Sequence, residues 1–348
     1  MFTDKKVKRP QRNSSIELYR IIATFAVLIL HLNGWFLGDW PFPTYDISNP
    51  TIFRTGQMVI QAATIICVNM FVIITGYFSI KLKLSSLIKL YVYLVLIYVP
   101  LYLVRYVSTY EFLFSVFLER CFAISYAGYF IQCYFMLMIL SPVINAFFEK
   151  YGKRSMRWVI AFVVIEFWFA CIMVVEEFGY NHGYSVIHFV LMYMIARCIR
   201  LYEDEIKKIK PYVWGAGYLL FTIAIMMSHI AGIKWCWDYS SPFVVFSSVC
   251  SFLPFLYKTY YNRFVNWIAS GTLAVYIIHV TNHARVVLGK VDSQLLETNS
   301  YPMYLVKIAI VILITFIVLA LYGVICNYIS NRITKGIDAK MKGYFEFK

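Results

Sequence analysis

The chain has 348 residues, of which 61% are hydrophobic and 14% are charged, and its mean hydropathy is +0.68. A soluble domain carries about 25% charged residues, so these values exclude a soluble globular protein and predict a single transmembrane domain over residues 1–348. The formal net charge of +14 indicates contact with membrane lipids rather than with nucleic acid, because basic residues gather in cytoplasmic loops beside anionic lipid.

The chain begins with a basic stretch, residues 1–14, that precedes a long apolar segment. No small-residue cleavage site follows this segment, so we expect it to be kept as a membrane helix rather than removed as a signal peptide. Residues 1–14 are then expected to form a basic cytoplasmic N-terminus, and residues 330–348 a cytoplasmic tail.

The first apolar segment, residues 15–36, carries Glu17, Arg20 and His31. A charged group in the hydrocarbon costs at least about 2.5–3.5 kcal/mol on insertion scales, so such residues indicate a functional site. At about 100° and 1.5 Å per residue, Arg20 and His31 point from one helix face and lie about 16 Å apart along the axis. Glu17 lies one turn before Arg20 and can orient it through an ion pair.

The chemistry of these side chains suggests two roles. A partly desolvated neutral imidazole, here His31, suits a general base that takes a proton from a hydroxyl. An arginine near the cytoplasmic surface, here Arg20, suits a phosphate-bearing ligand that enters from the cytosol.

About 20 apolar residues are needed to cross a bilayer, and ten segments approach or meet this requirement. They are 15–36, 58–80, 87–107, 128–148, 158–176, 184–201, 212–231, 242–260, 265–285 and 303–329. Residues 109–126 are also apolar but contain Glu111, Glu119 and Arg120, which predicts an amphipathic interfacial helix instead of a span. The expected fold is therefore an all-α bundle of about ten transmembrane helices.

The positions of lysine and arginine set the direction of these segments. With the N-terminus in the cytoplasm, 24 of the 32 Lys and Arg residues fall on the cytoplasmic side and 7 outside, with Arg20 in the membrane. This bias predicts that both termini are cytoplasmic. We expect a multi-pass protein of the plasma (inner) membrane.

The eight cysteines stand singly, mostly within apolar runs, and no Cys-x-x-Cys occurs. This pattern predicts buried thiols that pack as small hydrophobic groups, rather than a metal site or a disulfide framework. The outer loop 37–57 has Trp35 and Trp40 near its start and could bind sugar by stacking, although interfacial tryptophan is common on membrane proteins.

Four stretches carry a family resemblance. Ile16-Glu17-Leu18-Tyr19-Arg20, followed by His31, resembles the opening signature of the acyltransferase-3 family of membrane acyltransferases. Three later stretches resemble family blocks in the same order: 71–77 (FVIITGY, with Thr for the usual Ser), 129–142 (starting Tyr-Phe for Trp-Phe) and 269–279 (ASGTLAVYIIH). Length and helix count agree, so the resemblance covers essentially the whole chain.

The resemblance implies transfer of an acyl group, commonly acetyl from acetyl-CoA, to a hydroxyl of a cell-surface or lipid-linked glycan, as in O-acetylation of polysaccharide. It implies that His31 is the catalytic imidazole and that Arg20 engages the acyl-CoA donor. Glu17, beside Arg20, completes the candidate catalytic set. Acyl-CoA and a glycan are then the expected substrates, and no permanently bound cofactor is expected.

Many members of that family have Arg-x-x-Arg in the short cytoplasmic loop after the second helix, where this chain has Lys81, Lys83 and then Lys89. Lysine can neutralise phosphate but lacks the bidentate fork of arginine. These lysines are therefore either ligands for the phosphates of CoA or ordinary positive-inside charge.

Tyr276 and His279 are candidates for a second wall of the site. His283 follows His279 at i+4, a spacing that could place two metal ligands on one helix face, but no third ligand has a recognisable spacing, so no metal is expected. Glu166 is another intramembrane carboxyl, which either pairs with a polar neighbour or borders the cavity.

A different class of function uses the same buried charges. A multi-pass transporter or exporter of a glycan precursor or small polar solute would employ them for substrate binding or proton coupling. Substrate uptake by proteoliposomes without an acyl donor would favour this alternative.

Overall fold

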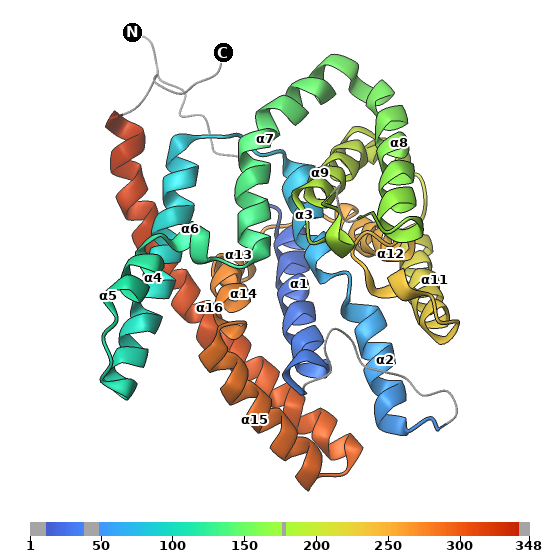
Figure 1. Ribbon diagram of the computed structural model, residues 1–348. Helices are drawn as coiled ribbons and strands as arrows, with labels where there is room; N and C mark the ends of the chain where they lie inside the picture. Colours follow the sequence, from blue (N-terminus) through green and yellow to red (C-terminus); the bar gives the residue numbers. More distant parts are fainter. Residues whose placement is uncertain (1–11, 38–48, 176–178, 341–348) are drawn as a thin grey trace.

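A computed structural model describes residues 12–37, 49–175 and 179–340, and these residues form helices and connecting loops without a β-strand. The all-α fold class predicted from hydropathy is confirmed for this part of the chain. Helix α1 (Ser14–Asn33) lies in the middle of the bundle (Figure 1) and contacts α2, α3, α13 and α14. The apolar segment that carries Glu17, Arg20 and His31 is therefore a central helix.

The other α-helices follow in chain order: α2 (Ile52–Thr64), α3 (Cys67–Phe78), α4 (Leu84–Thr109), α5 (Phe114–Cys121), α6 (Ala123–Tyr126), α7 (Tyr129–Tyr151), α8 (Met156–Glu166), α9 (Val186–Leu201), α10 (Glu203–Ile206), α11 (Pro211–Ile230), α12 (Pro242–Phe252), α13 (Arg263–Ala269), α14 (Thr272–His279), α15 (Asn282–Thr298) and α16 (Tyr301–Lys340). Shorter helical turns are η1 (Trp35–Leu37), η2 (Gly152–Ser155), η3 (Phe167–Ile172), η5 (Asn181–Gly183), η6 (Lys234–Trp237) and η7 (Leu253–Leu256).

Within the described ranges, seven helical stretches are long and apolar enough to cross a membrane, or up to eight if the bent pair α13–α14 and α15 is one span. This is fewer than the ten segments predicted, although each of the ten overlaps helix. One reason is α9, which has only 16 residues.

The other reason is the 44-residue stretch Tyr129–Ile172, which that count treats as one span. As one straight helix it would be about 66 Å long, about twice the hydrocarbon thickness. Figure 1 instead shows α7 and α8 running in opposite directions, and the chain turns at Gly152, where φ is +51°.

The predicted span 265–285 is wrong at its C-terminal end. Helix α14 ends at His279 and α15 begins at Asn282 after a bend of 85°. The Thr281 backbone N–H and hydroxyl both donate to the carbonyl of Ile278, which closes α14 with a tight turn. His279 and His283 therefore lie on different helices, and the predicted i, i+4 face does not exist.

The stretch 109–126 does not form a span, as predicted, but it is not one helix either. Tyr110, with φ of +56°, ends α4, and the short helices α5 and α6 follow. Neither is long enough to cross a bilayer.

Small residues bring some helices close together. A Cβ on Gly76 would lie 2.6 Å from the backbone oxygen of Tyr193, so only glycine permits this approach of α3 to α9. Gly271, the residue before α14, faces the backbone of Ala320 on α16 in the same way. The eight cysteines are free, and all but Cys121 are buried, which confirms their predicted packing role.

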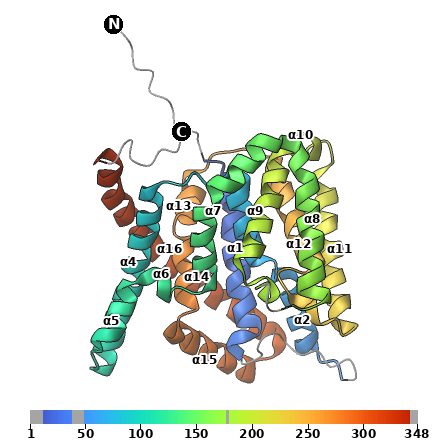
Figure 2. The ribbon, with the colours of Figure 1, turned by 45° about the horizontal axis from the view of Figure 1, so that its top comes forward.

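The described ends of the chain lie at the same end of the bundle. The start of α1, the loop between α3 and α4 and the C-terminal end of α16 are at the top of Figure 1, and Figure 2 shows the same arrangement from another angle. The C-terminal end of α1, with His31, lies toward the opposite end beside α2 and α15.

Candidate functional site

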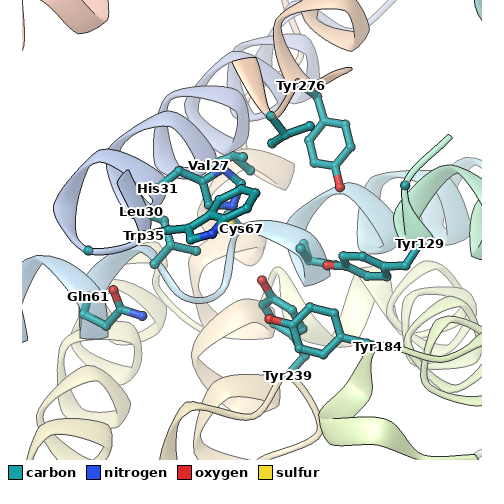
Figure 3. Close-up of a pocket in the computed structure, with 14 residues that line it drawn as sticks. Val27, Leu30, His31, Trp35, Gln61, Cys67, Tyr129, Tyr184, Tyr239 and Tyr276 are labelled. Atoms are coloured by element: carbon teal, nitrogen blue, oxygen red, sulfur yellow. The ribbon is translucent and has the colours of Figure 1, made fainter. Parts of the chain in front are cut away.

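A cavity of about 410 Å³ lies beside the C-terminal half of α1 (Figure 3). Six segments far apart in the sequence contribute polar or aromatic side chains to its wall. The polar and aromatic side chains in it come from α1 and η1, from α2, from α7, from the loops before α9 and α12, and from α14: His31, Trp35, Gln61, Tyr129, Tyr184, Tyr239 and Tyr276.

His31 and His279 form a hydrogen-bonded pair, with 2.8 Å between His31 Nδ1 and His279 Nε2. His279 Nδ1 lies 2.6 Å from the carbonyl oxygen of Val275, which can only accept, so this nitrogen carries the proton. Neutral His279 then accepts at Nε2, and His31 must donate from Nδ1. The network leaves Nε2 as the unprotonated nitrogen of the His31 ring.

Packing holds the His31 ring in this orientation. The Trp35 ring meets it edge-on, with centroids 4.9 Å apart and planes at 72°, and His279 is completely buried behind it. Because the imidazole is fixed between an indole and a second imidazole, its basic nitrogen is held in one place on the cavity wall.

Tyrosine rings cover the side of the cavity opposite α1. The ring centroids of Tyr129 and Tyr184 are 4.6 Å apart, and those of Tyr184 and Tyr239 are 5.0 Å apart. Figure 3 shows the hydroxyl groups of Tyr129, Tyr239 and Tyr276 turned toward one another. Aromatic faces with hydroxyl groups can stack on a sugar ring and hydrogen-bond to it, or donate to a carbonyl oxygen.

The predicted partner of Arg20 is present, but the pair is not in this cavity. Arg20 Nε lies 3.1 Å from Glu17 Oε2, and the Arg20 side chain is one-third exposed. Neither residue lines the cavity, and Arg20 is about 16 Å from His31 along the axis of α1.

A row of aromatic rings leads from the Arg20 region toward His31. Arg20 is close enough to Tyr134 of α7 to interact with it electrostatically. Tyr134 stacks on Phe130 with ring centroids 6.3 Å apart, and Phe130 lies 4.7 Å from Tyr276 on the cavity wall. Three neighbouring rings, those of Tyr134 and Phe130 on α7 and Tyr276 on α14, thus extend from the vicinity of Arg20 to the cavity wall.

The lysines singled out from the sequence lie at the same end of the bundle as the start of α1. Lys81 and Lys83 are exposed in the loop before α4, and Lys89 is half-buried on α4, where it repels Arg12 electrostatically. None of them lines the cavity. The structure therefore places a basic cluster (Arg12, Arg20, Lys81, Lys83 and Lys89) at one end of the bundle and His31 nearer the other.

Glu166 belongs to a buried network that also supports the cavity. Both of its carboxylate oxygens lie within 3.2 Å of His188 Nδ1, and His188 Nε2 is 2.9 Å from Asn69 Oδ1. The Asn69 amide donates to the backbone oxygen of Tyr239, so its oxygen faces His188 and accepts from Nε2–H. Glu166 thus has a polar neighbour, and the network holds the loop that carries Tyr239.

Replacing His188 with alanine should lower the stability of the protein strongly, because Glu166 would remain buried without its partner. Loss of one partner of a buried pair costs about 3–5 kcal/mol, which corresponds to a melting temperature lower by roughly 10 °C. Melting of the detergent-solubilised protein measures this. Glu166→Gln, which keeps an acceptor for His188, should lower the melting temperature less, and an unchanged value for His188→Ala would contradict the assignment.

Sequence reasoning missed most of the cavity wall. Gln61, Tyr184 and Tyr239 come from three separate elements, and no spacing relates them to His31. Tyr129 stood in a block that resembles the family, which is the only signal that pointed to it. Among the described residues, no group of three His, Cys, Asp or Glu side chains could hold a metal ion.

These features define a class: a multi-pass helical membrane protein with a paired-histidine centre in an aromatic cavity. The model of the acyltransferase 3 family, described as an acyltransferase domain, matches residues 13–330. The chain belongs to this family and is a membrane acyltransferase, which confirms the resemblance carried by the four sequence blocks. Searches of curated proteins and of solved structures found no significant match.

Proposed function

We propose that the protein moves an acetyl group from acetyl-CoA, bound at the cytoplasmic end of the bundle, to a hydroxyl of a cell-surface or lipid-linked glycan. The main support for this proposal is the series of hydrogen bonds that links the carbonyl of Val275, His279 and His31. It leaves a basic nitrogen at the wall of a cavity large enough for a sugar and a thioester.

In the proposed reaction, His31 Nε2 takes the proton of the glycan hydroxyl while the hydroxyl oxygen attacks the thioester carbonyl carbon. The tetrahedral intermediate collapses, the carbon–sulfur bond breaks, and the proton on His31 passes to the departing thiolate. Between these two proton transfers His31 is an imidazolium, and its Nδ1–H still donates to His279 Nε2. Hydroxyl groups of the wall, such as that of Tyr276, would donate to the developing oxyanion.

The donor side of the proposal uses the basic cluster. Arg20, Lys81, Lys83 and Lys89 would hold the phosphates of acetyl-CoA, and the pantetheine arm would follow the aromatic row toward His31. This arrangement places the start of α1 and the C-terminal end of α16 on the cytoplasmic side of the plasma (inner) membrane. The Lys and Arg bias and the shared end of α1 and α16 support it.

Acetyl transfer by the purified protein tests the proposal. Proteoliposomes would receive labelled acetyl-CoA and the glycan fraction of the producing cells, and mass spectrometry would identify the modified glycan. Transfer of label supports the proposal. Solute uptake that needs no acyl donor, with no transfer, would instead support a transporter.

Arg20→Ala should raise the KM for acetyl-CoA about 10- to 100-fold, because a charge-assisted contact to phosphate contributes about 1.5–3 kcal/mol. Steady-state kinetics with varied donor measures this. Arg20→Lys keeps the charge but not the hydrogen-bond geometry to Glu17. Its KM for acetyl-CoA should lie between those of the unchanged protein and Arg20→Ala. A variant with an unchanged KM and a lowered kcat would show that Arg20 does not bind the donor.

A further inference from the structure

A second cavity, of about 140 Å³, lies between α4, α5, α6 and the start of α15. Its wall contains two guanidinium groups and an imidazole, from Arg105, Arg120 and His283, together with aromatic residues such as Tyr126. No aspartate or glutamate of the described chain is among its lining residues. This composition favours an anion.

Arg120 has a free donor at this cavity. Its guanidinium carbon lies 3.3 Å from the centre of the Tyr126 ring, which fixes the plane of the group. Its Nη1 is buried, yet has no hydrogen-bond acceptor among the described residues. A buried donor of this kind is costly unless an acceptor occupies the adjacent space, and the guanidinium fork matches the oxygens of phosphate.

The backbone adds positive potential on the opposite wall. Thr281 and His283, at the start of the 17-residue helix α15, both line the cavity. The Thr281 hydroxyl is bonded back to Ile278, so α15 has no side-chain cap on its first amide groups. Uncapped amides at the positive end of a helix favour an anionic ligand.

The second cavity adjoins the first. Val280 lines the cavity of His31 and the next residue, Thr281, lines the second; likewise Gly128 lines the first and Tyr126 the second. The second cavity is also remote from the basic cluster, because Lys83 and Arg105 are separated by about 33 Å along α4. The phosphates of a donor bound at that cluster therefore do not reach it.

We propose that Arg105, Arg120 and His283 form a binding site for a phosphate group carried by the acceptor, which makes the acceptor a phosphate-bearing glycan. This inference rests on the proposed function, since it assigns the anion to the acceptor. A phosphate held here leaves a neighbouring sugar hydroxyl free to enter the cavity of His31.

Binding of glycerol 1-phosphate to the protein in phosphatidylcholine nanodiscs tests the site, measured as a thermal shift against chloride at equal ionic strength. We expect saturable stabilisation with a Kd raised at least tenfold in Arg120→Gln. Arg105→Gln provides a second variant if Arg120→Gln does not fold. The matched control is Arg54→Gln, at the same end of the bundle, where the guanidinium bonds Gln57; its Kd should not change.

Further experiments distinguish a phosphate of the acceptor from a phosphate of acetyl-CoA or of a membrane lipid. In the transfer assay, glycerol 1-phosphate should compete with the glycan fraction and not with acetyl-CoA; competition with acetyl-CoA would overturn the proposal. No stabilisation by glycerol 1-phosphate, or stabilisation only by phosphatidylglycerol in the nanodisc, would also overturn it. Arg120-dependent binding by a protein that transfers no acetyl group would refute the proposed function and leave the phosphate site standing.

Discussion

His31→Ala should lower kcat for acetyl transfer by about 10²–10⁴-fold, the usual contribution of a general base. The loss follows because His31 Nε2 is the unprotonated nitrogen that the hydrogen-bond network places at the cavity. Donor affinity should stay within about twofold, since Arg20 lies about 16 Å from His31 along α1 and the lysines of the basic cluster do not line the cavity. Transfer kinetics and equilibrium binding of acetyl-CoA measure the two effects separately.

The control for this variant is His229→Gln, which replaces a histidine at the C-terminal end of α11 that does not line the cavity. Its transfer rate should be unchanged. Full activity of His31→Ala, with the variant folded and able to bind acetyl-CoA, would exclude His31 as the base. A similar loss in both variants would show instead that the assay reports general stability.

His279→Ala should lower kcat about 10²-fold without changing the KM for acetyl-CoA. His279 accepts from His31 Nδ1–H, so its removal allows the other tautomer, in which His31 Nε2 carries the proton and cannot act as a base. Removal also leaves a buried donor without an acceptor. His279 is thus a positioning residue that acts through His31.

The conservative variant His279→Gln distinguishes positioning from a structural role. Its amide oxygen can accept from His31 Nδ1–H, so it should recover at least about tenfold of the rate lost in His279→Ala. Comparable melting temperatures for the two variants would show that the difference is not one of stability. Equal losses of rate in both would argue against tautomer control by His279.

The accuracy of the sequence-based predictions depended on how local each feature is. The apolar segments were located well, because hydrophobic length is a property of one stretch of chain. The bend after His279 was missed, because it depends on a turn at Ile278 and Thr281 that is embedded in an apolar pattern. The count of spans differs because α9 is short and because α7 and α8 turn back at Gly152.

Some residues of the candidate site were indicated by local sequence motifs, and others were placed only by tertiary packing. The motif around Arg20 and His31 pointed to the central helix, and the late block pointed to Tyr276 and His279. The ring of tyrosines could not be inferred, because Tyr184 and Tyr239 lie in loops whose positions depend on packing and on the network of Asn69, His188 and Glu166. The second cavity was missed because Arg120 and His283 come to line one cavity only when α5 and α15 take their places in the fold.

By itself, the sequence determined that this protein lies in a membrane and that α1 carries Arg20 and His31. It also determined that four stretches of the chain resemble those of an acyltransferase family. These are matters of composition and short-range order. Only the tertiary structure decided that His31 meets His279, 248 positions away, and therefore which of its nitrogens is basic. A proton's position in an imidazole depends on the acceptor that packing brings to it, and no local pattern specifies that partner.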